Sequence, residues 1–75
     1  MTIKHWLSPK LKVKGMLQKD LAKRCGVCSQ AITAYVTGRS DPSAVTIYRI
    51  AEAISESPEQ RNQYIAELVT IIYNR

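Results

Sequence analysis

The sequence predicts an all-α domain made of five helices. Apolar residues recur at helical spacings of three and four through most of the chain. Two short helical patterns meet at Gly26 with only a tight turn between them. Further on, Ser57-Pro58-Glu59-Gln60 forms a capping box with proline at the first helical position, which marks the start of a last helix. A chain of 75 residues is long enough for one small domain.

A first helix is expected over residues 2–15. The residues that share its apolar side are Ile3, Trp6, Leu7, Leu11 and Lys14. Pro9 lies inside this segment, where it either removes a backbone hydrogen bond or restarts the helix with Ser8 as the N-cap. Residues 10–14 alternate in polarity as a strand would, so the helix is predicted here against a competing pattern.

The second helix should run from Gln18 to Cys25 and stop at Gly26, because glycine readily takes the left-handed conformation of a helix end. The third should begin at Cys28 or Ser29, run to about Thr37 and be closed by Gly38. Leu21, Ala22, Val27, Ile32 and Tyr35 fall where two crossing helices would share a small core. This pair has the spacing of a helix-turn-helix, whose second helix lies in the DNA major groove.

Two more helices complete the predicted domain. Pro42 belongs to a turn, and Ser43 then caps a fourth helix. Its expected apolar face is Val45, Ile47, Ile50, Ala51 and Ile54, with Tyr48 beside it. The fifth helix should run from Pro58 to about Tyr73. Its apolar set is wider than a single stripe and consists of Tyr64, Ile65, Leu68, Val69, Ile71 and Ile72.

Positive charge is concentrated in the first half of the chain. The formal net charge is +5, but residues 1–39 hold eight Lys and Arg against one acidic residue, whereas residues 40–75 hold three against five. The half that carries the helix-turn-helix pattern is therefore the half suited to a polyanion. A merely soluble surface with uneven charge is the alternative interpretation.

Residues 17–54 resemble the Cro and phage-repressor type of helix-turn-helix, also called the xenobiotic-response-element family. The residues that carry the resemblance are Gln18, Leu21-Ala22, Gly26-Val27, Ile32, Tyr35, Gly38, Pro42 and Ile50-Ala51. The resemblance implies a compact five-helix, phage-repressor-like domain that binds operator DNA as a two-fold dimer. In that arrangement the second helix rests on the DNA backbone and the third reads bases.

Base contacts are expected from the exposed side of the third helix, because Ala31, Ile32 and Tyr35 are needed inside. The predicted base-contacting residues are Ser29, Gln30, Thr33 and Ala34. Gln30 can make a two-pronged bond to adenine, and the methyl groups of Thr33 and Ala34 can meet a thymine methyl. These residues favour half-sites that contain A·T pairs. An ordinary polar surface on a helix pair is the alternative.

Phosphate contacts are expected around the ends of the same two helices. Gln18 lies at a helix N-terminus, where free backbone N–H groups favour a phosphate, although it is also simply a good helix former. The resemblance places further backbone contacts just after the recognition helix, and two lysines are plausible additions. The predicted phosphate-contacting residues are Gln18, Lys19, Thr37, Arg39, Ser40 and Lys14.

The chain departs from the family pattern at two positions. Val36 stands where many members carry an acidic residue that pairs with an arginine of the first helix, and no arginine precedes Arg24 here. Apolar packing against the first helix is the expected replacement. Cys28 stands where serine or threonine usually caps the third helix, so capping is expected to pass to Ser29 and shift the helix start by one residue.

The wide apolar set of the fifth helix indicates a homodimer interface. Tyr64, Leu68, Val69, Ile71 and Ile72 are the predicted interface residues. The alternative is a helix that folds back to complete the core of the monomer, and the two can both hold in part. A two-fold dimer would place its recognition helices about 34–36 Å apart, on half-sites about 10 bp apart.

Cys25-Gly26-Val27-Cys28 is a C-x-x-C, which raises a zinc or dithiol interpretation. With one histidine, His5, and two cysteines in the chain, a zinc site would need carboxylates. Cys25 is therefore expected in the core and Cys28 as incidental, with a redox-sensing role as the minor alternative. We expect no metal, no other cofactor and no small-molecule ligand. Catalysis is not expected either, because no serine or cysteine has an obvious base near it.

No segment resembles a signal peptide, and no apolar run approaches the about 20 residues that cross a bilayer. We expect a cytoplasmic, nucleoid-associated protein without membrane contact. The sequence predicts a homodimeric regulator, more specifically a repressor, that binds double-stranded DNA at an inverted-repeat operator. Residues 1–56 would form the DNA-binding core and residues 57–75 the dimerisation element of the same domain. Such regulators are frequent in phages, plasmids and other mobile elements.

Two other functions fit the same sequence. The protein would be an antitoxin that represses its own promoter if the fifth helix gripped a toxin. It would be a protein–protein interaction adaptor if its basic face were incidental.

Overall fold

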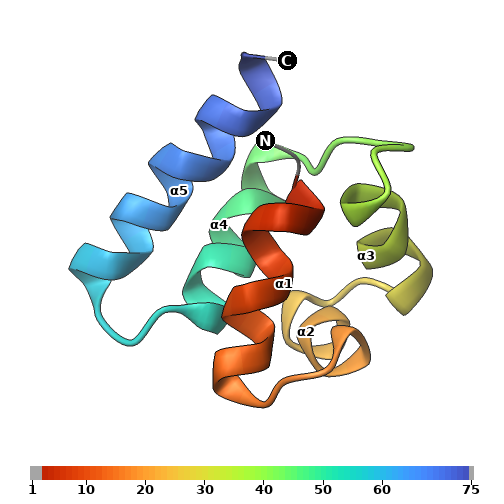
Figure 1. Cartoon of the computed structure of the whole chain (residues 1–75), viewed down its shortest axis with the longest axis horizontal. Helices are drawn as coiled ribbons and strands as arrows, with labels where there is room; N and C mark the ends of the chain where they lie inside the picture. The colour runs from red at the N-terminus through yellow and green to blue at the C-terminus, as the bar shows by residue number, and fades with distance from the viewer. Residues whose placement is uncertain (1–2, 75) are drawn as a thin grey trace.

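The computed structural model describes residues 3–74, and within that range it contains five α-helices and no strand (Figure 1). The helices are α1 (Ile3–Lys14), α2 (Gln18–Cys25), α3 (Ser29–Val36), α4 (Ala44–Ile54) and α5 (Pro58–Tyr73). Figure 1 shows α4 and α5 side by side on one flank of the molecule, with α1 between α5 and α3. The predicted all-α fold of five helices is confirmed.

One hydrophobic core joins all five helices. Each helix contributes a leucine or isoleucine that is almost wholly buried, and these are Leu7, Leu21, Ile32, Ile50 and Leu68. Burying such a side chain contributes about 1.5–3 kcal/mol. Because every helix supplies one of these residues, no helix can leave the core without exposing a large apolar side chain.

Helix α1 continues through Pro9 without a break. An interior proline costs about 3 kcal/mol or more through its missing N–H and its clash with the preceding turn. Ile3, Trp6 and Leu7 before Pro9, and Leu11 after it, are all buried, so their combined burial outweighs that cost. The helix prediction for residues 10–14 is confirmed, and a restart at Ser8 is not seen. Lys14, expected on the apolar side, is exposed at the helix end, where its charge stays in water.

Helix α4 buries a face that differs from the predicted one at its first turn. Val45 is 60% exposed, whereas Thr46 is buried together with Ile47, Ile50, Ala51 and Ile54. Thr46 lies four residues before Ile50 and therefore on the buried stripe, while Val45 points away from that stripe. The inclusion of Val45 in the core was wrong for this reason.

Serine side chains cap α4 and α5 as predicted. The Ser43 hydroxyl accepts a hydrogen bond from the N–H of Thr46 at 3.3 Å, and that of Ser57 accepts one from the N–H of Gln60 at 3.1 Å. The Gln60 side chain reaches back to the N–H of Glu56 at 2.7 Å, one residue before the cap. The entry into α5 is thus fixed by two reciprocal bonds.

The buried side chains of α5 serve the core of the monomer. Leu68, Ile71 and Ile72 are buried there, and Leu68 has no exposed surface. Leu68 therefore has no surface to offer a second subunit. The large apolar side chains of α5 that remain exposed are Val69 and Tyr73.

Truncating Leu68 and truncating its neighbour Val69 should have very different effects on stability. Leu68→Ala is expected to lower the free energy of unfolding by about 2–5 kcal/mol, because it leaves a cavity in the core that joins the five helices. Val69→Ala, at 38% exposure, should cost under about 1 kcal/mol. Urea unfolding of both variants, followed by circular dichroism at one protein concentration, measures the difference. Equal losses would contradict the placement of Leu68 in the monomer core.

Candidate nucleic-acid interface

The turn between α2 and α3 depends on Gly26. Its φ of +71° is in the left-handed region, which costs a residue with a side chain about 1–2 kcal/mol. In that conformation the N–H of Gly26 bonds to the Lys23 carbonyl at 3.3 Å and the N–H of Val27 to the Ala22 carbonyl at 3.0 Å. These two bonds close α2 and reverse the chain within one residue. The predicted tight turn at Gly26 is confirmed.

Arg49 of α4 holds this turn from the outside. Its Nη1 donates a hydrogen bond to the Cys25 carbonyl at 3.1 Å, which is one of the carbonyls at the C-terminal end of α2. A cation there also complements the helix dipole. Arg49 was not selected by sequence analysis, because it is 24 residues from Cys25 and nothing local marks the contact.

Helix α3 begins at Ser29, with Cys28 in the N-cap position. The Cys28 side chain makes no capping hydrogen bond, while its carbonyl accepts from the N–H of Ala31 at 3.0 Å. Capping therefore does not pass to Ser29, and the expected shift of the helix start is wrong. Ser29 is the first residue of the helix instead, so its hydroxyl is free of that structural role.

The four residues predicted to contact bases line the outer side of α3. Ser29, Gln30 and Thr33 are exposed and Ala34 is half-buried. On the opposite side, Ile32 and Val36 are buried in the core. The packing beneath α3 therefore turns a short, mostly polar side of the helix towards the outside.

The amide of Gln18 lies next to this side of α3. The Oε1 of Gln18 is 3.4 Å from the hydroxyl of Thr33, which also donates to the Ser29 carbonyl at 3.1 Å. The N-terminal end of α2 and the outer side of α3 therefore form one surface. Gln18 and Lys19 also occupy the first turn of α2, where the helix has no carbonyl to pair with their N–H groups.

The Asp20 carboxylate accepts a hydrogen bond from another N–H group at this end of α2. Its Oδ2 accepts a hydrogen bond from the N–H of Leu17 at 3.2 Å, which completes a capping box without a capping side chain at Leu17. That N–H is therefore already paired. An anion at this helix end would meet the N–H groups of Gln18 and Lys19.

The loop after α3 is folded back onto the end of that helix. The N–H of Arg39 bonds to the Ala34 carbonyl at 2.9 Å, through Gly38 at a φ of +79°. The Thr37 hydroxyl bonds to the Thr33 carbonyl at 2.8 Å. This loop, which is hydrogen-bonded to the end of α3, exposes Thr37, Arg39 and Ser40.

Lys14 lies apart from the other predicted phosphate contacts. It lines a shallow cleft with Asp20, Lys23 and Arg24, between the end of α1 and one side of α2. Lys4, which was not selected from the sequence, lines a different cleft with Thr37 and Gly38. No local pattern marks Lys4, because only the packing of α1 against α3 brings it to this cleft.

Val36 occupies the position where the family pattern led us to expect apolar packing instead of an ion pair. It is buried, and it belongs to the same core cluster as Ile3 and Trp6 of α1. Helices α1 and α3 are in direct contact. The expected apolar replacement is confirmed.

The two cysteines are in different environments. Cys25 is buried in the core, and burial raises the pKa of its thiol, although the charge of Arg49 opposes this shift. Cys28 is exposed. The shift of Cys25 contributes stability below the ordinary thiol pKa, and that contribution is lost as the pH rises through the higher folded-state value. The predicted core position of Cys25 is confirmed.

Residues 3–74 contain neither a membrane-spanning helix nor a metal-binding cluster. No helix in this range is long and apolar enough to cross a membrane. The same residues hold no cluster of three His, Cys, Asp or Glu side chains placed to bind a metal ion.

Comparison with known proteins places the sequence of this chain among helix-turn-helix domains. The family described as "Helix-turn-helix" matches residues 11–60, which span α2, α3 and α4. An uncharacterised HTH-type transcriptional regulator of Methanothermobacter thermautotrophicus is 44% identical over 43 residues. Those residues are 57% of this chain and 62% of that relative. No solved structure matches the chain significantly.

The two thiols should react at different rates in the folded protein. At about pH 8 a thiol reagent is expected to label Cys28 quickly and Cys25 only after unfolding, because the thiolate is the reacting form and Cys25 is buried with a raised pKa. Mass spectrometry of the labelled chain, with and without denaturant, measures both rates. Cys28→Ser should abolish the fast phase. Labelling of both residues at one rate in native buffer would overturn this prediction.

Proposed function

This chain belongs to the Cro-type helix-turn-helix family, and we propose that it is a transcriptional repressor that occupies an inverted-repeat operator as a homodimer. The family consists of DNA-binding transcriptional regulators and is non-enzymatic. The observation that carries the proposal is the single surface formed by Gln18 and the outer side of α3, where Gln18 lies 3.4 Å from Thr33. A surface of this shape presents a helix N-terminus and polar side chains together to one DNA groove.

In the proposed complex α3 lies in the major groove. Gln30 would bond to the N6 and N7 edge of an adenine, while the methyl groups of Thr33 and Ala34 would contact a thymine methyl. Ser29, at the first position of α3, would reach a base or the adjacent phosphate. The half-site is therefore expected to contain A·T pairs under α3.

Phosphate contacts on both sides of α3 would fix its register. Gln18 and Lys19 offer N–H groups and side chains at the start of α2. Thr37, Arg39 and Ser40 offer their side chains after α3, because their N–H groups are already bonded to carbonyls of that helix. Lys14 would act only at longer range, because it lies in the cleft beside Lys23 and Arg24. The net charge of +7 over residues 1–39, from eight basic residues and Asp20, favours this face over the acidic second half.

The proposed dimer would use the apolar side chains that the monomer leaves exposed on α4 and α5. Among residues 3–74 six large hydrophobic side chains are exposed, and four of them are Val45, Tyr48, Val69 and Tyr73. Tyr48 accepts a hydrogen bond from Arg61 at 3.2 Å, which links the two helices at this surface. Of the interface predicted from the sequence, Val69 has the most exposed side chain. Tyr64 is half-buried, and the other three belong to the core.

Gln30→Ala should reduce discrimination at one base pair of the operator. Selection from random duplex DNA at a stated salt concentration would first define the preferred sequence. Gln30→Ala removes a two-pronged bond to adenine. The difference in binding free energy between the selected duplex and the variant at that base pair is therefore expected to fall by about 1–3 kcal/mol. Fluorescence anisotropy with the selected duplex and its single-base variants measures this difference. An unchanged preference at every position would refute the assignment of Gln30 to base reading.

Arg39→Ala is the matched control for this experiment. Removal of a phosphate contact should weaken binding to all duplexes by a similar factor and reduce the log–log salt slope by about one. A loss of affinity that depends on the identity of one base pair would contradict this, because it would mean that Arg39 contacts a base. Absence of any salt-dependent duplex binding by the wild type would favour the adaptor function.

Val69→Asp should weaken self-association. A charge on the exposed part of α5 is expected to raise the dimer dissociation constant at least about tenfold, because it would be buried without a partner. Sedimentation equilibrium measures this constant. Val13→Asp, at an 88% exposed site on α1, is the control and should leave it unchanged. A wild-type chain that stays monomeric at high micromolar concentration, with one copy on DNA, would contradict the dimer.

A further inference from the structure

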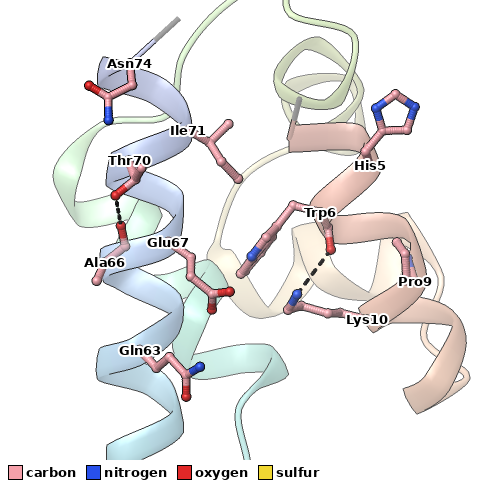
Figure 2. A pocket seen from close by; sticks show the side chains of 10 residues that line it. All are labelled: His5, Trp6, Pro9, Lys10, Gln63, Ala66, Glu67, Thr70, Ile71 and Asn74. Atoms are coloured by element: carbon pink, nitrogen blue, oxygen red, sulfur yellow. Dashed lines mark hydrogen bonds between the residues drawn. The ribbon is translucent and has the colours of Figure 1, made fainter. Parts of the chain in front are cut away.

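A groove with no role in the proposed DNA contacts runs between α1 and α5 (Figure 2). Its volume is about 740 Å³, which falls within the range of small-molecule sites. Trp6 and Pro9 of α1 and Ala66 and Ile71 of α5 supply apolar surface, and Lys10 and Glu67 supply charge. We refer to it as the α1–α5 groove.

Two buried polar atoms in this groove have no hydrogen-bond partner among residues 3–74. They are Nε1 of Trp6, whose side chain is only 4% exposed, and Oε2 of Glu67. Figure 2 shows the indole of Trp6 reaching from α1 towards α5 and Glu67 reaching back from α5. Buried donors and acceptors are nearly always paired. The groove therefore offers one unused donor and one unused acceptor to a ligand.

The indole of Trp6 is held in a fixed position. Its ring meets that of Tyr64 edge to face, with centroids 5.4 Å apart. Nζ of Lys10 lies 4.1 Å from the centroid of the indole and donates to the Trp6 carbonyl at 3.4 Å. This bond uses one of the three N–H donors of the Lys10 ammonium. These contacts keep the indole N–H in place before a ligand arrives, which lowers the entropic cost of binding.

We propose that the α1–α5 groove binds a small molecule that has a flat apolar body and a carboxamide group. The carboxamide oxygen accepts from Nε1 of Trp6, and its N–H donates to Oε2 of Glu67. The apolar body lies against Ile71, Ala66 and Pro9. A carboxylate would be repelled by Glu67, and an amine would leave the indole N–H without an acceptor. This inference does not rest on DNA binding, and it departs from the expectation that no small molecule binds.

Benzamide is a suitable probe, because it consists of one aromatic ring and one carboxamide. Trp6 is the only tryptophan of the chain, so its indole N–H gives a single resonance in a ¹H–¹⁵N spectrum. Titration with benzamide is expected to move this resonance in a saturable way, with a dissociation constant in the millimolar range typical of such small ligands. Benzoate should bind at least about tenfold more weakly, since it brings a negative charge to Glu67.

Glu67→Ala should weaken benzamide binding at least about tenfold, because it removes the acceptor for the amide N–H. Glu59→Ala is the matched control: it removes the same charge from the first turn of α5, outside the groove, and should leave the affinity unchanged. Circular dichroism of both variants verifies that they are folded. In Glu67→Ala, the affinity for benzoate should rise relative to that for benzamide, because the Glu67 charge that repels benzoate has been removed.

Each of the following results would overturn the proposal. One is an indole resonance that does not move at the highest soluble concentration of benzamide. Another is equal binding of benzamide and benzoate, or equal affinity in Glu67→Ala and the wild type. The third is displacement of benzamide by self-association of the chain, which would assign the groove to a second copy.

Discussion

The hydrogen bond from Arg49 to the Cys25 carbonyl joins α4 to α2 at the turn that leads into α3. It ties α4 to the last carbonyls of α2, beside the residue whose left-handed conformation directs the chain into α3. A side chain at Gly26 would strain the backbone and would also lie 3.5 Å from Nη1 of Arg49. The direction in which α3 leaves α2 therefore depends on one glycine and one arginine, together with the buried pair Leu21 and Ile32.

This constraint explains how eight residues of helix can present a reading surface. A helix as short as α3 is not stable alone in water, so its position comes from packing. Ile32 and Val36 anchor it from below, and the bond from Arg39 to Ala34 closes its end. The outer side is left with short polar side chains that are not needed for the fold. Side chains on that side can therefore change while the core stays the same.

Local sequence signals predicted most of the fold but not its long-range contacts. The end of α2 at Gly26 and the start of α5 at Pro58 follow from capping chemistry that lies within a few residues, and the structure places them there. Periodicity predicted which side of a helix is apolar, but not what that side meets. The interface predicted for α5 is thus mainly core, and Leu68 is the clearest case. The Arg49 contact and the α1–α5 groove are formed by residues that are far apart in the chain, so no local sequence pattern predicts them.

Whether α3 meets the edges of paired bases is the claim on which the functional account depends. An NMR titration of the ¹⁵N-labelled chain with its selected duplex tests it most directly. The account predicts that the largest amide shifts fall on residues 18–19, 29–34 and 37–40, with small changes along the solvent side of α5. Shifts confined to α1 and α5, with residues 29–34 unchanged, would contradict it.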